Sequence, residues 1–351
     1  MKKKILKALR VVLTIVIILG LTFCLQAVLM PKYLSAQPEG SMIAEYYDEE
    51  KDFDVVFIGD CEVYENFIPA VLWEEYGINS YIRGSAQQLI WQSYYLMEET
   101  LSYEKPDVIV FNIMSMKYNE PQREEYNRMS LDGMRWSRYK IQSIKASMTE
   151  EESFVDYIFP ILRFHDRYKE LTLEDLTAAF GHEKVTHNGY LMQTGVRGIT
   201  KENYPTGRVL ADYTFGGNAY DYLDRMVSLC EDAGVQLVFV KAPSLSPYWY
   251  DEYEAQIDAY AAEHDIPYIN YLELIEEVGI DFETDTYDMG LHLNLDGATK
   301  LSGHFGAFLS EELQVPDRRG EEHLSAVWEE KLEAFYSEIE EKAAAEGSGK
   351  E

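Results

Sequence analysis

Residues 54–67 read Asp-Val-Val-Phe-Ile-Gly-Asp-Cys-Glu-Val-Tyr-Glu-Asn-Phe, and the fold prediction begins from this stretch. Residues 55–58 form a short, wholly apolar run, which is typical of a strand in a parallel sheet that is buried on both faces. The apolar run ends at Gly59-Asp60, and the next residue is Cys61. The stretch therefore predicts a strand, a sharp turn and the start of a helix, with a cysteine at the turn.

The rest of the chain alternates apolar strands with helical patterns, which predicts an α/β fold with a doubly wound parallel sheet. Further strands are expected at residues 80–83, 108–112, 235–240 and 267–271. Helices are expected at residues 69–76, 87–103, 218–233, 252–264 and 297–313. Between about residues 117 and 205 the alternation lapses, and we interpret this part as a helical insertion.

The N-terminus predicts a transmembrane anchor. Residues 1–10 are basic, and residues 11–31 contain no charged side chain. That apolar length matches the roughly 20 residues needed to cross a bilayer. Basic residues before the span favour a cytoplasmic N-terminus and an exported remainder. A cleaved signal peptide is the alternative, but the apolar run is long and no small-x-small site closes it, so we expect an uncleaved, single-pass anchor in the cell membrane.

Three further segments complete the predicted organisation. Residues 32–51 are expected to be a linker, and residues 52–320 the α/β domain with its insertion. Residues 321–351 alternate Leu, Trp and Phe with Glu, which predicts an acidic, exposed helix that frays. The 62 acidic residues outnumber the 31 basic ones, for a net charge of −31, so nucleic acid is not an expected partner.

The chain has three cysteines, too few for a disulfide framework. Cys230 falls on the apolar face of a predicted helix and is interpreted as packing. Cys61 is expected to be a free thiol outside the membrane. Free cysteine is commonly a small buried hydrophobe, so a structural role for Cys61 stays open at this point.

Residues able to carry chemistry follow the predicted strands, where ligands of open α/β sheets bind. These residues are Cys61, Gly84, Asn112 and, before the last helix, His292. Each also has a structural interpretation besides the functional one. Gly84 is suited to a turn with positive φ, and Asn112 to capping a turn.

In type and order these residues resemble the sequence blocks of the SGNH/GDSL hydrolases, with cysteine at the serine position. The matching segments are Gly59-Asp60-Cys61, Gly84, Asn112 and His292-Leu-Asn-Leu-Asp-Gly297. The likeness spans residues 52–315, interrupted by the insertion. The whole chain also resembles a clostridial-type group of membrane-anchored members. The resemblance implies an SGNH-hydrolase-like, flavodoxin-like three-layer fold.

The resemblance also implies a mechanism. Cys61 would attack an ester carbonyl, with His292 as general base and then general acid. Many family members carry the orienting acid three residues before the histidine, where this chain has Met289. Asp288 stands one residue further back, and Gly290 would let the loop bring it round. Asp285 is the second candidate for this acid.

The oxyanion is expected to lie between backbone N–H groups of Cys61 and Gly84 and the side-chain amide of Asn112. Asp60, and Lys241 at the end of a strand, are expected to line the same pocket. Asp60 and Glu62 would raise the pKa of the thiol, whereas a helix N-terminus and protonated His292 would lower it. The sequence does not decide between these opposing effects.

The expected function is that of an extracytoplasmic esterase or O-acyltransferase acting on an envelope glycan or polyol polymer. A catalytically silent SGNH fold that binds envelope polymer or an assembly partner is the alternative, because the serine is replaced and the usual acid is displaced. A redox-regulated thiol protein is a third. A membrane acyltransferase is a candidate partner, besides acylated carbohydrate and the membrane itself.

No cofactor and no metal are expected, because His182 and His187 are loosely spaced and lack convincing partner ligands. Within the insertion, Arg163, His165 and Arg167 stand close together. They would either grip a phosphate or carboxylate, or form salt bridges with nearby acids. Both interpretations stay open from the sequence.

Overall fold

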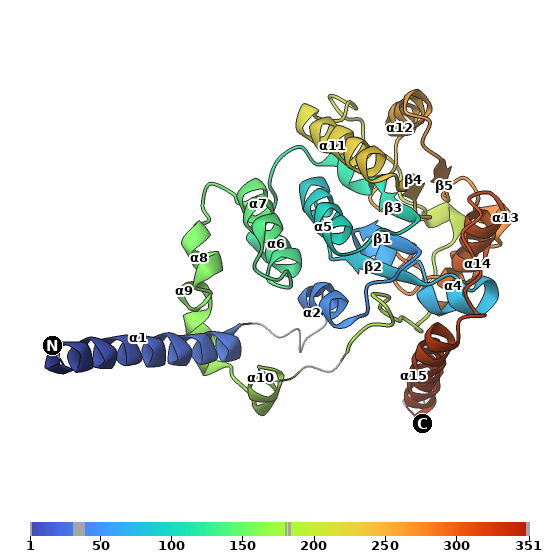
Figure 1. Ribbon diagram of the computed structural model, residues 1–351. Helices are drawn as coiled ribbons and strands as arrows, with labels where there is room; N and C mark the ends of the chain where they lie inside the picture. Colours follow the sequence, from blue (N-terminus) through green and yellow to red (C-terminus); the bar gives the residue numbers. More distant parts are fainter. Residues whose placement is uncertain (1, 31–38, 180, 182–183, 349–351) are drawn as a thin grey trace.

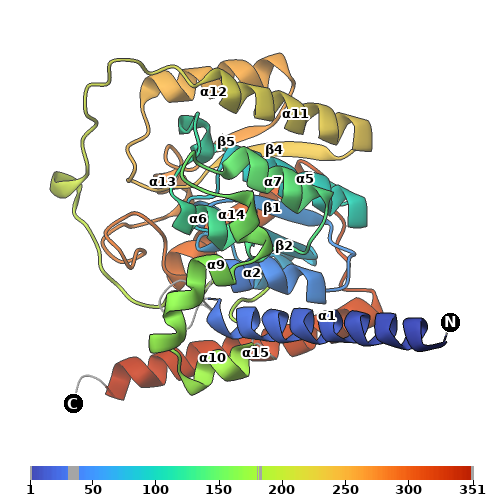
Figure 2. The same cartoon turned by 90° about the vertical axis from the view of Figure 1, so that its left-hand side faces the viewer.

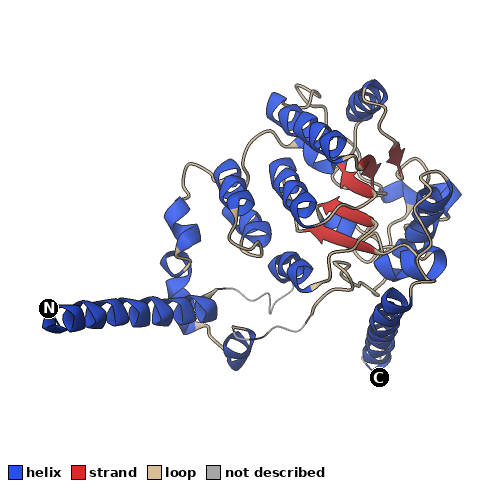
Figure 3. Ribbon diagram, viewed as in Figure 1, coloured by secondary structure: helices blue, strands red, loops and turns tan. Residues whose placement is uncertain are grey.

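The computed structural model describes residues 2–30, 39–179, 181 and 184–348. At its centre lies a parallel sheet in the order β2-β1-β3-β4-β5, enclosed between helices (Figure 1; Figure 3). The strands are β1 (Val55–Gly59), β2 (Ser80–Gly84), β3 (Val108–Asn112), β4 (Gln236–Lys241) and β5 (Tyr268–Asn270). The predicted α/β fold with a parallel sheet is confirmed, and each strand end lies within one residue of its expected position.

Both faces of the sheet are buried, as the continuous apolar strands predict. Val55 and Phe57 belong to one core, whereas Val56 and Ile58 belong to a second core on the other face. The first core is covered by α4 (Pro69–Tyr76) and α14 (Leu295–Glu311), and the second by α5 (Ile90–Tyr103), α11 (Gly217–Ala233) and α12 (Asp251–Glu263) (Figure 1). The result is a three-layer arrangement with helices on both faces.

The segment before β1 is not the linker that its sequence predicts. Residues 31–38 of the expected linker lie outside the described residues, but α2 (Glu39–Glu45) and η1 (Tyr46–Asp48) follow them. Ile43 and Tyr46 are fully buried. These apolar side chains therefore make residues 42–48 part of the folded body.

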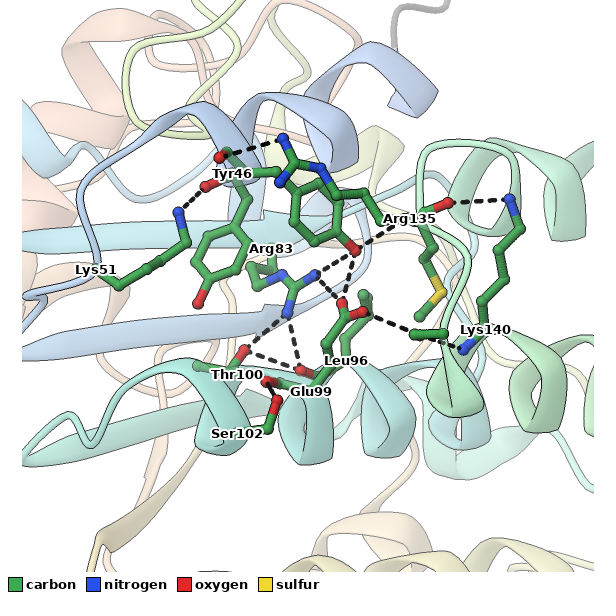
Figure 4. A network of polar contacts seen from close by, with 12 residues as sticks. Tyr46, Lys51, Arg83, Leu96, Glu99, Thr100, Ser102, Arg135 and Lys140 are labelled. Carbon is green, nitrogen blue, oxygen red and sulfur yellow. Dashed lines mark hydrogen bonds and ion pairs between the residues drawn. The ribbon is translucent and has the colours of Figure 1, made fainter.

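A buried arginine joins this segment to the sheet (Figure 4). Arg83, the residue before Gly84 on β2, is inaccessible to solvent. Its guanidinium donates to Glu99 Oε2 at 2.7 Å and to Thr100 Oγ1 at 2.9 Å, both on α5. The Tyr47 hydroxyl donates to the same Glu99 oxygen at 2.7 Å. Because a buried guanidinium is costly unless it is paired, this network fixes the end of β2 against α5 and η1.

The insertion is helical, as predicted, and has no strand among its described residues. It follows η2 (Ile113–Lys117), and its helices are α6 (Glu124–Leu131), α7 (Arg138–Ser147), α8 (Phe154–Ile158), α9 (Ile161–Phe164), η3 (His165–Lys169), α10 (Leu173–Ala178) and η4 (Lys201–Asn203). The remaining short helices are α3 (Cys61–Tyr64) and α13 (Ile275–Val278).

The first helix, α1 (Lys2–Leu29), is apolar, exposed along most of its length and long enough to cross a membrane. Its C-terminal end contacts α9, η3 and α10 of the insertion (Figure 2). A signal sequence would have the same length and composition.

The C-terminal helix, α15 (Glu322–Ser348), differs from the exposed tail that its sequence predicts. Trp328 is buried and stacks on Trp73 of α4, with ring centroids 5.3 Å apart and the planes 6° from parallel. Phe335, two turns further on, is buried as well, whereas Tyr336 is exposed. One face of α15 therefore completes the first core, because Trp328 packs on α4 and Phe335 packs on Tyr190.

We expect Trp328→Ala to lower the free energy of unfolding by about 3–5 kcal/mol, as is typical when a buried tryptophan is truncated. The loss would include its indole hydrogen bond to Asn79. Tyr336→Ala on the same helix is the control and should cost less than about 1 kcal/mol, since that ring is exposed. Urea unfolding of the full chain in mild detergent, followed by near-UV circular dichroism, measures both. Equal effects of the two substitutions would contradict the docking of α15.

Candidate active site

The candidate site lies at the carboxyl edge of the sheet. Gly59 and Gly84 are register partners at the ends of β1 and β2, and Asn112 ends β3 on the other side of β1. Cys61 begins α3, one residue beyond the turn. In this strand order the topological switch point falls between β1 and β3, where ligands of doubly wound sheets bind.

The two glycines are needed for space. A Cβ atom on Gly59 would lie 2.8 Å from the Cβ of Asn112, and one on Gly84 would lie 3.0 Å from a ring carbon of Tyr64. The φ of Gly84 is outside the left-handed region, so the interpretation of Gly84 as a positive-φ turn is wrong. The end of β3 excludes a side chain at Gly59, and the close approach of α3 excludes one at Gly84.

A short loop brings Asp288 onto His292. The imidazole Nδ1 lies 2.7 Å from Asp288 Oδ2, and the backbone N–H of His292 donates to Asp288 Oδ1 at 2.8 Å. Met289 and Gly290 between them have φ values of +69° and +86°, which turns the chain back on itself. Asp285 instead accepts a hydrogen bond from Lys300 at 2.6 Å. Of the two candidate acids, the structure brings Asp288 to the histidine.

A second carboxylate also reaches the imidazole. Glu65 Oε2 lies 2.9 Å from His292 Nδ1 and accepts a hydrogen bond from the Tyr287 hydroxyl at 2.7 Å. The Tyr287 ring lies nearly parallel to the imidazole. The sequence reasoning did not anticipate Glu65 or Tyr287. The one signal for Glu65 is its position four residues after Cys61, which is one helical turn.

The pKa of His292 is raised well above its usual range. Burial opposes the charge, but the interaction with Cys61 and the hydrogen bonds to the Asp288 and Glu65 carboxylates outweigh it. The other ring nitrogen, Nε2, is buried and has no hydrogen-bond partner of normal geometry in the described part of the chain. His292 and Cys61 each shift the pKa of the other, so the imidazole and the thiol belong to one site.

Burial decides the titration of Cys61. It raises the pKa of the thiol to about 11, and Asp60 and Glu65 add to the shift while His292 opposes it. The helix that begins at Cys61 has four residues, too few for a strong N-terminal field. The opposing effects predicted from the sequence are thus resolved toward a neutral thiol at rest.

Asp60 caps this short helix rather than facing open solvent. Its carboxylate accepts the backbone N–H of Glu62 at 3.1 Å and is buried. Burial, together with the negative charge of Glu62, raises the pKa of Asp60 to about 6, while Lys117 opposes the shift. Lys117, at the end of η2, is a further cation at the site that the sequence reasoning missed.

Beneath Cys61 lies a buried ion pair. Glu62 Oε1 lies 3.2 Å from the Lys241 ammonium, and Ser244 Oγ donates to the same carboxylate oxygen. Lys241 is inaccessible to solvent, and its ammonium also donates to the carbonyl of Ala242 at 2.6 Å. The expectation that Lys241 lines the pocket is therefore corrected: its charge is neutralised by Glu62 below the site.

Asn112 is held by the same carboxylate. Its side-chain amide donates to Glu62 Oε2 at 3.0 Å, and its carbonyl oxygen accepts the backbone N–H of Met114 at 2.8 Å, which caps η2. An amide nitrogen carries two hydrogens, so one remains for an incoming oxygen. The capping interpretation of Asn112 and its place at the site are thus compatible.

Two other clusters from the sequence have local partners. Arg163 pairs with Glu124 at 3.0 Å and Arg167 with Asp175 at 2.9 Å, so the salt-bridge interpretation of this basic cluster holds. His187 lies 2.7 Å from Glu338, while His182 lies outside the described residues. Within the described ranges, no group of His, Cys, Asp and Glu side chains is arranged to hold a metal ion.

An aromatic cleft of about 350 Å³ adjoins the His292 loop. Its walls include Tyr204, Leu245, Tyr248, Trp249, Tyr250 and Glu254. Leu245 donates its backbone N–H to the carbonyl of Gly290 at 2.7 Å. The cleft therefore shares a wall with the loop that carries Asp288 and His292.

The chain matches no protein-family model and no curated protein. Among solved structures, it is similar to a protein assigned to the lipolytic G-D-S-L family from Desulfitobacterium hafniense DCB-2, with 13% identity, a TM-score of 0.37, and coverage of 73% of this chain and 98% of that one. It is also similar to a gut microbial diltiazem-metabolizing enzyme, with 14% identity, a TM-score of 0.25, and coverage of 73% of this chain and 48% of that one.

The buried pair can be tested by a double-mutant cycle. We expect Lys241→Met alone to cost about 3–5 kcal/mol of stability, because it leaves the Glu62 carboxylate buried without its counter-charge. Adding Glu62→Gln should restore part of that loss, since the unpaired charge is then removed. Urea unfolding of the wild type, both single variants and the double variant measures the coupling. Strictly additive losses would contradict a direct Glu62–Lys241 pairing.

Thiol titration tests the electrostatics of Cys61. Because the thiolate is the reactive form, a pKa of about 11 predicts that alkylation of Cys61 by iodoacetamide accelerates about tenfold per pH unit from pH 7 to 10. Mass spectrometry of the Cys61 peptide gives the rate. In Glu65→Gln the same profile should shift to lower pH, since one negative neighbour of the thiol is lost. A plateau beginning below pH 7 would show a preformed thiolate instead.

Proposed function

We propose that the chain is an SGNH-like ester-processing enzyme that works through a thioester on Cys61. The observation that carries this proposal is the geometry of His292, with Nδ1 on Asp288, Nε2 buried and unpaired, and Cys61 close enough to interact with the ring. A histidine oriented by a carboxylate and placed beside a nucleophile is the arrangement that acyl transfer requires. Its position at the switch point of the sheet supports the same function.

In the proposed reaction the Cys61 sulfur attacks the ester carbonyl while its proton passes to His292 Nε2. The developing oxyanion would accept hydrogen bonds from the N–H groups of Cys61 and Gly84 and the second amide hydrogen of Asn112. Each such donor is typically worth about 3 kcal/mol in the transition state. The alcohol then leaves with the proton from His292, and water or a hydroxyl acceptor takes the acyl group by the reverse steps.

Asp288 and Glu65 would hold the imidazolium that forms at each step. The same two carboxylates also keep the imidazole charged at rest, where it cannot accept a proton. Activity should therefore rise with pH, as the neutral form of His292 becomes populated.

The proposed substrate is an acylated polymer of the cell envelope, reached from a membrane anchor. The span α1 would hold the catalytic domain at the outer surface, with its basic end in the cytoplasm. Tyr248 of the aromatic cleft, which is exposed, offers a ring face for sugars. Glu254 Oε2 already accepts hydrogen bonds from Trp249 and Tyr268, so its other oxygen would be the acceptor for hydroxyl groups. A membrane acyltransferase would be the source of acyl groups if Cys61 transfers rather than hydrolyses them.

A second candidate function is favoured by the thiol itself. A pKa of about 11 leaves Cys61 almost entirely neutral at pH 7, and His292 carries a proton rather than a vacant site for one. A protein with this resting state would bind acylated polymer in the aromatic cleft without turning it over. The two candidates differ in whether Cys61 ever becomes acylated.

Hydrolysis of p-nitrophenyl acetate by the full chain in mild detergent separates them. We expect Cys61→Ala and His292→Ala each to lower the rate of p-nitrophenyl acetate hydrolysis by at least about 100-fold. A general base usually contributes a factor of this size. Cys230→Ala is the matched control, because that thiol is buried away from the site. An acetyl group on the Cys61 peptide, found by mass spectrometry after rapid quenching, would support the enzyme. Identical rates for wild type and Cys61→Ala, with no adduct, favour the silent binder.

A further inference from the structure

Exposed apolar side chains are concentrated in one part of the insertion. Half of the exposed large apolar residues outside α1, among those described, lie between residues 155 and 176. They are Val155, Ile158, Phe159, Leu162, Tyr168, Leu173 and Leu176. Leu173 is 81% exposed and Leu162 54%. Monomeric soluble proteins rarely expose apolar residues in such a group, which indicates that something covers this surface.

This surface lies beside the end of the candidate membrane span. The Arg167 guanidinium donates to the carbonyl oxygen of Leu29 at 2.7 Å, and α9, η3 and α10 all contact α1. Leu29, on the last turn of α1, is buried by these contacts, whereas Val16 and Leu19 nearer its middle are exposed. Figure 1 shows α8 and α9 rising from the C-terminal end of α1, and Figure 2 shows α10 beside it. The apolar group therefore sits where α1 would leave the bilayer.

Long basic side chains stand at the centre of this segment. Arg163, Arg167 and Lys169 pair with the carboxylates of Glu124, Asp175 and Asp166, respectively. Such side chains keep their stems in an apolar layer while their charged ends, with these acids, stay in the polar headgroup layer. Tyr168, which is 63% exposed, has the amphipathic character of residues that line membrane interfaces.

We propose that residues 154–176 lie in the outer interface of the bilayer that α1 spans, as a second membrane contact of the same chain. The proposal rests on the membrane anchor of the proposed function, but not on its catalysis. Apolar side chains of α8, α9 and α10 would enter the boundary between headgroups and acyl chains, as in interfacial helices. Two contacts would fix the orientation of the α/β domain over the membrane.

Depth measurement on the full chain in liposomes tests the proposal. A bimane fluorophore is attached to Leu162→Cys or Leu173→Cys in a background with Cys24→Ser and Cys61→Ala, where the remaining Cys230 is buried. Val209→Cys is the matched control, an exposed apolar position that is 94% accessible and outside the segment. Native Cys24, labelled in the Cys61→Ala protein, reports on the span itself.

We expect doxyl-labelled lipids to quench positions 24, 162 and 173, and aqueous iodide to quench position 209. If positions 162 and 173 behave like 209 while 24 is quenched by lipid, the anchor stands and the interfacial contact is overturned. If position 24, like the other positions, is quenched by iodide and not by the doxyl-labelled lipids, the anchor and the contact both fail.

A parallel measurement uses a label at Arg163→Cys. Adding Leu162→Gln and Leu173→Gln should reduce the lipid quenching of this label relative to Arg163→Cys alone. Unchanged quenching in this pair would also overturn the contact.

Discussion

The buried carboxylate of Glu62 is the interaction on which the site depends. It follows Cys61 directly and binds Lys241 at the end of β4, Asn112 at the end of β3, and Ser244. One group thus ties the turn after β1 to the ends of two neighbouring strands. Separating the two charges would leave each of them buried without a partner, which is costly. The ion pair therefore holds α3 against the strand ends.

The nucleophile position and the base are held by different parts of the chain. Cys61 is fixed from below through Glu62, whereas His292 is fixed from the side by Asp288 and Glu65. Since Glu65 and Glu62 both belong to the stretch after β1, the two supports converge on residues 60–65. The electrostatic outcome is a site rich in carboxylates, in which the thiol stays neutral and the imidazole stays charged.

Local patterns were sufficient to predict the sheet and the neighbourhood of Cys61, Asn112 and His292, because parallel strands bring their carboxyl ends to one edge. They were also sufficient to favour Asp288 over Asp285, through the turn at Gly290. They failed where a contact joins distant segments: Lys241 pairs with Glu62 across 179 positions, and Glu65 reaches a histidine 227 positions later. The tail prediction failed similarly, since amphipathicity does not reveal that Trp328 has a partner in Trp73.

The stacking of Trp328 on Trp73 has a consequence for synthesis. The aromatic surface of α4 is made early in the chain, but the helix that covers it comes last. During synthesis this surface must therefore stay bare until residues beyond 328 have been made. A protein with such a late-closing core depends on the rate at which its end is delivered, and a chain cut short before α15 would retain its site residues yet expose an apolar face.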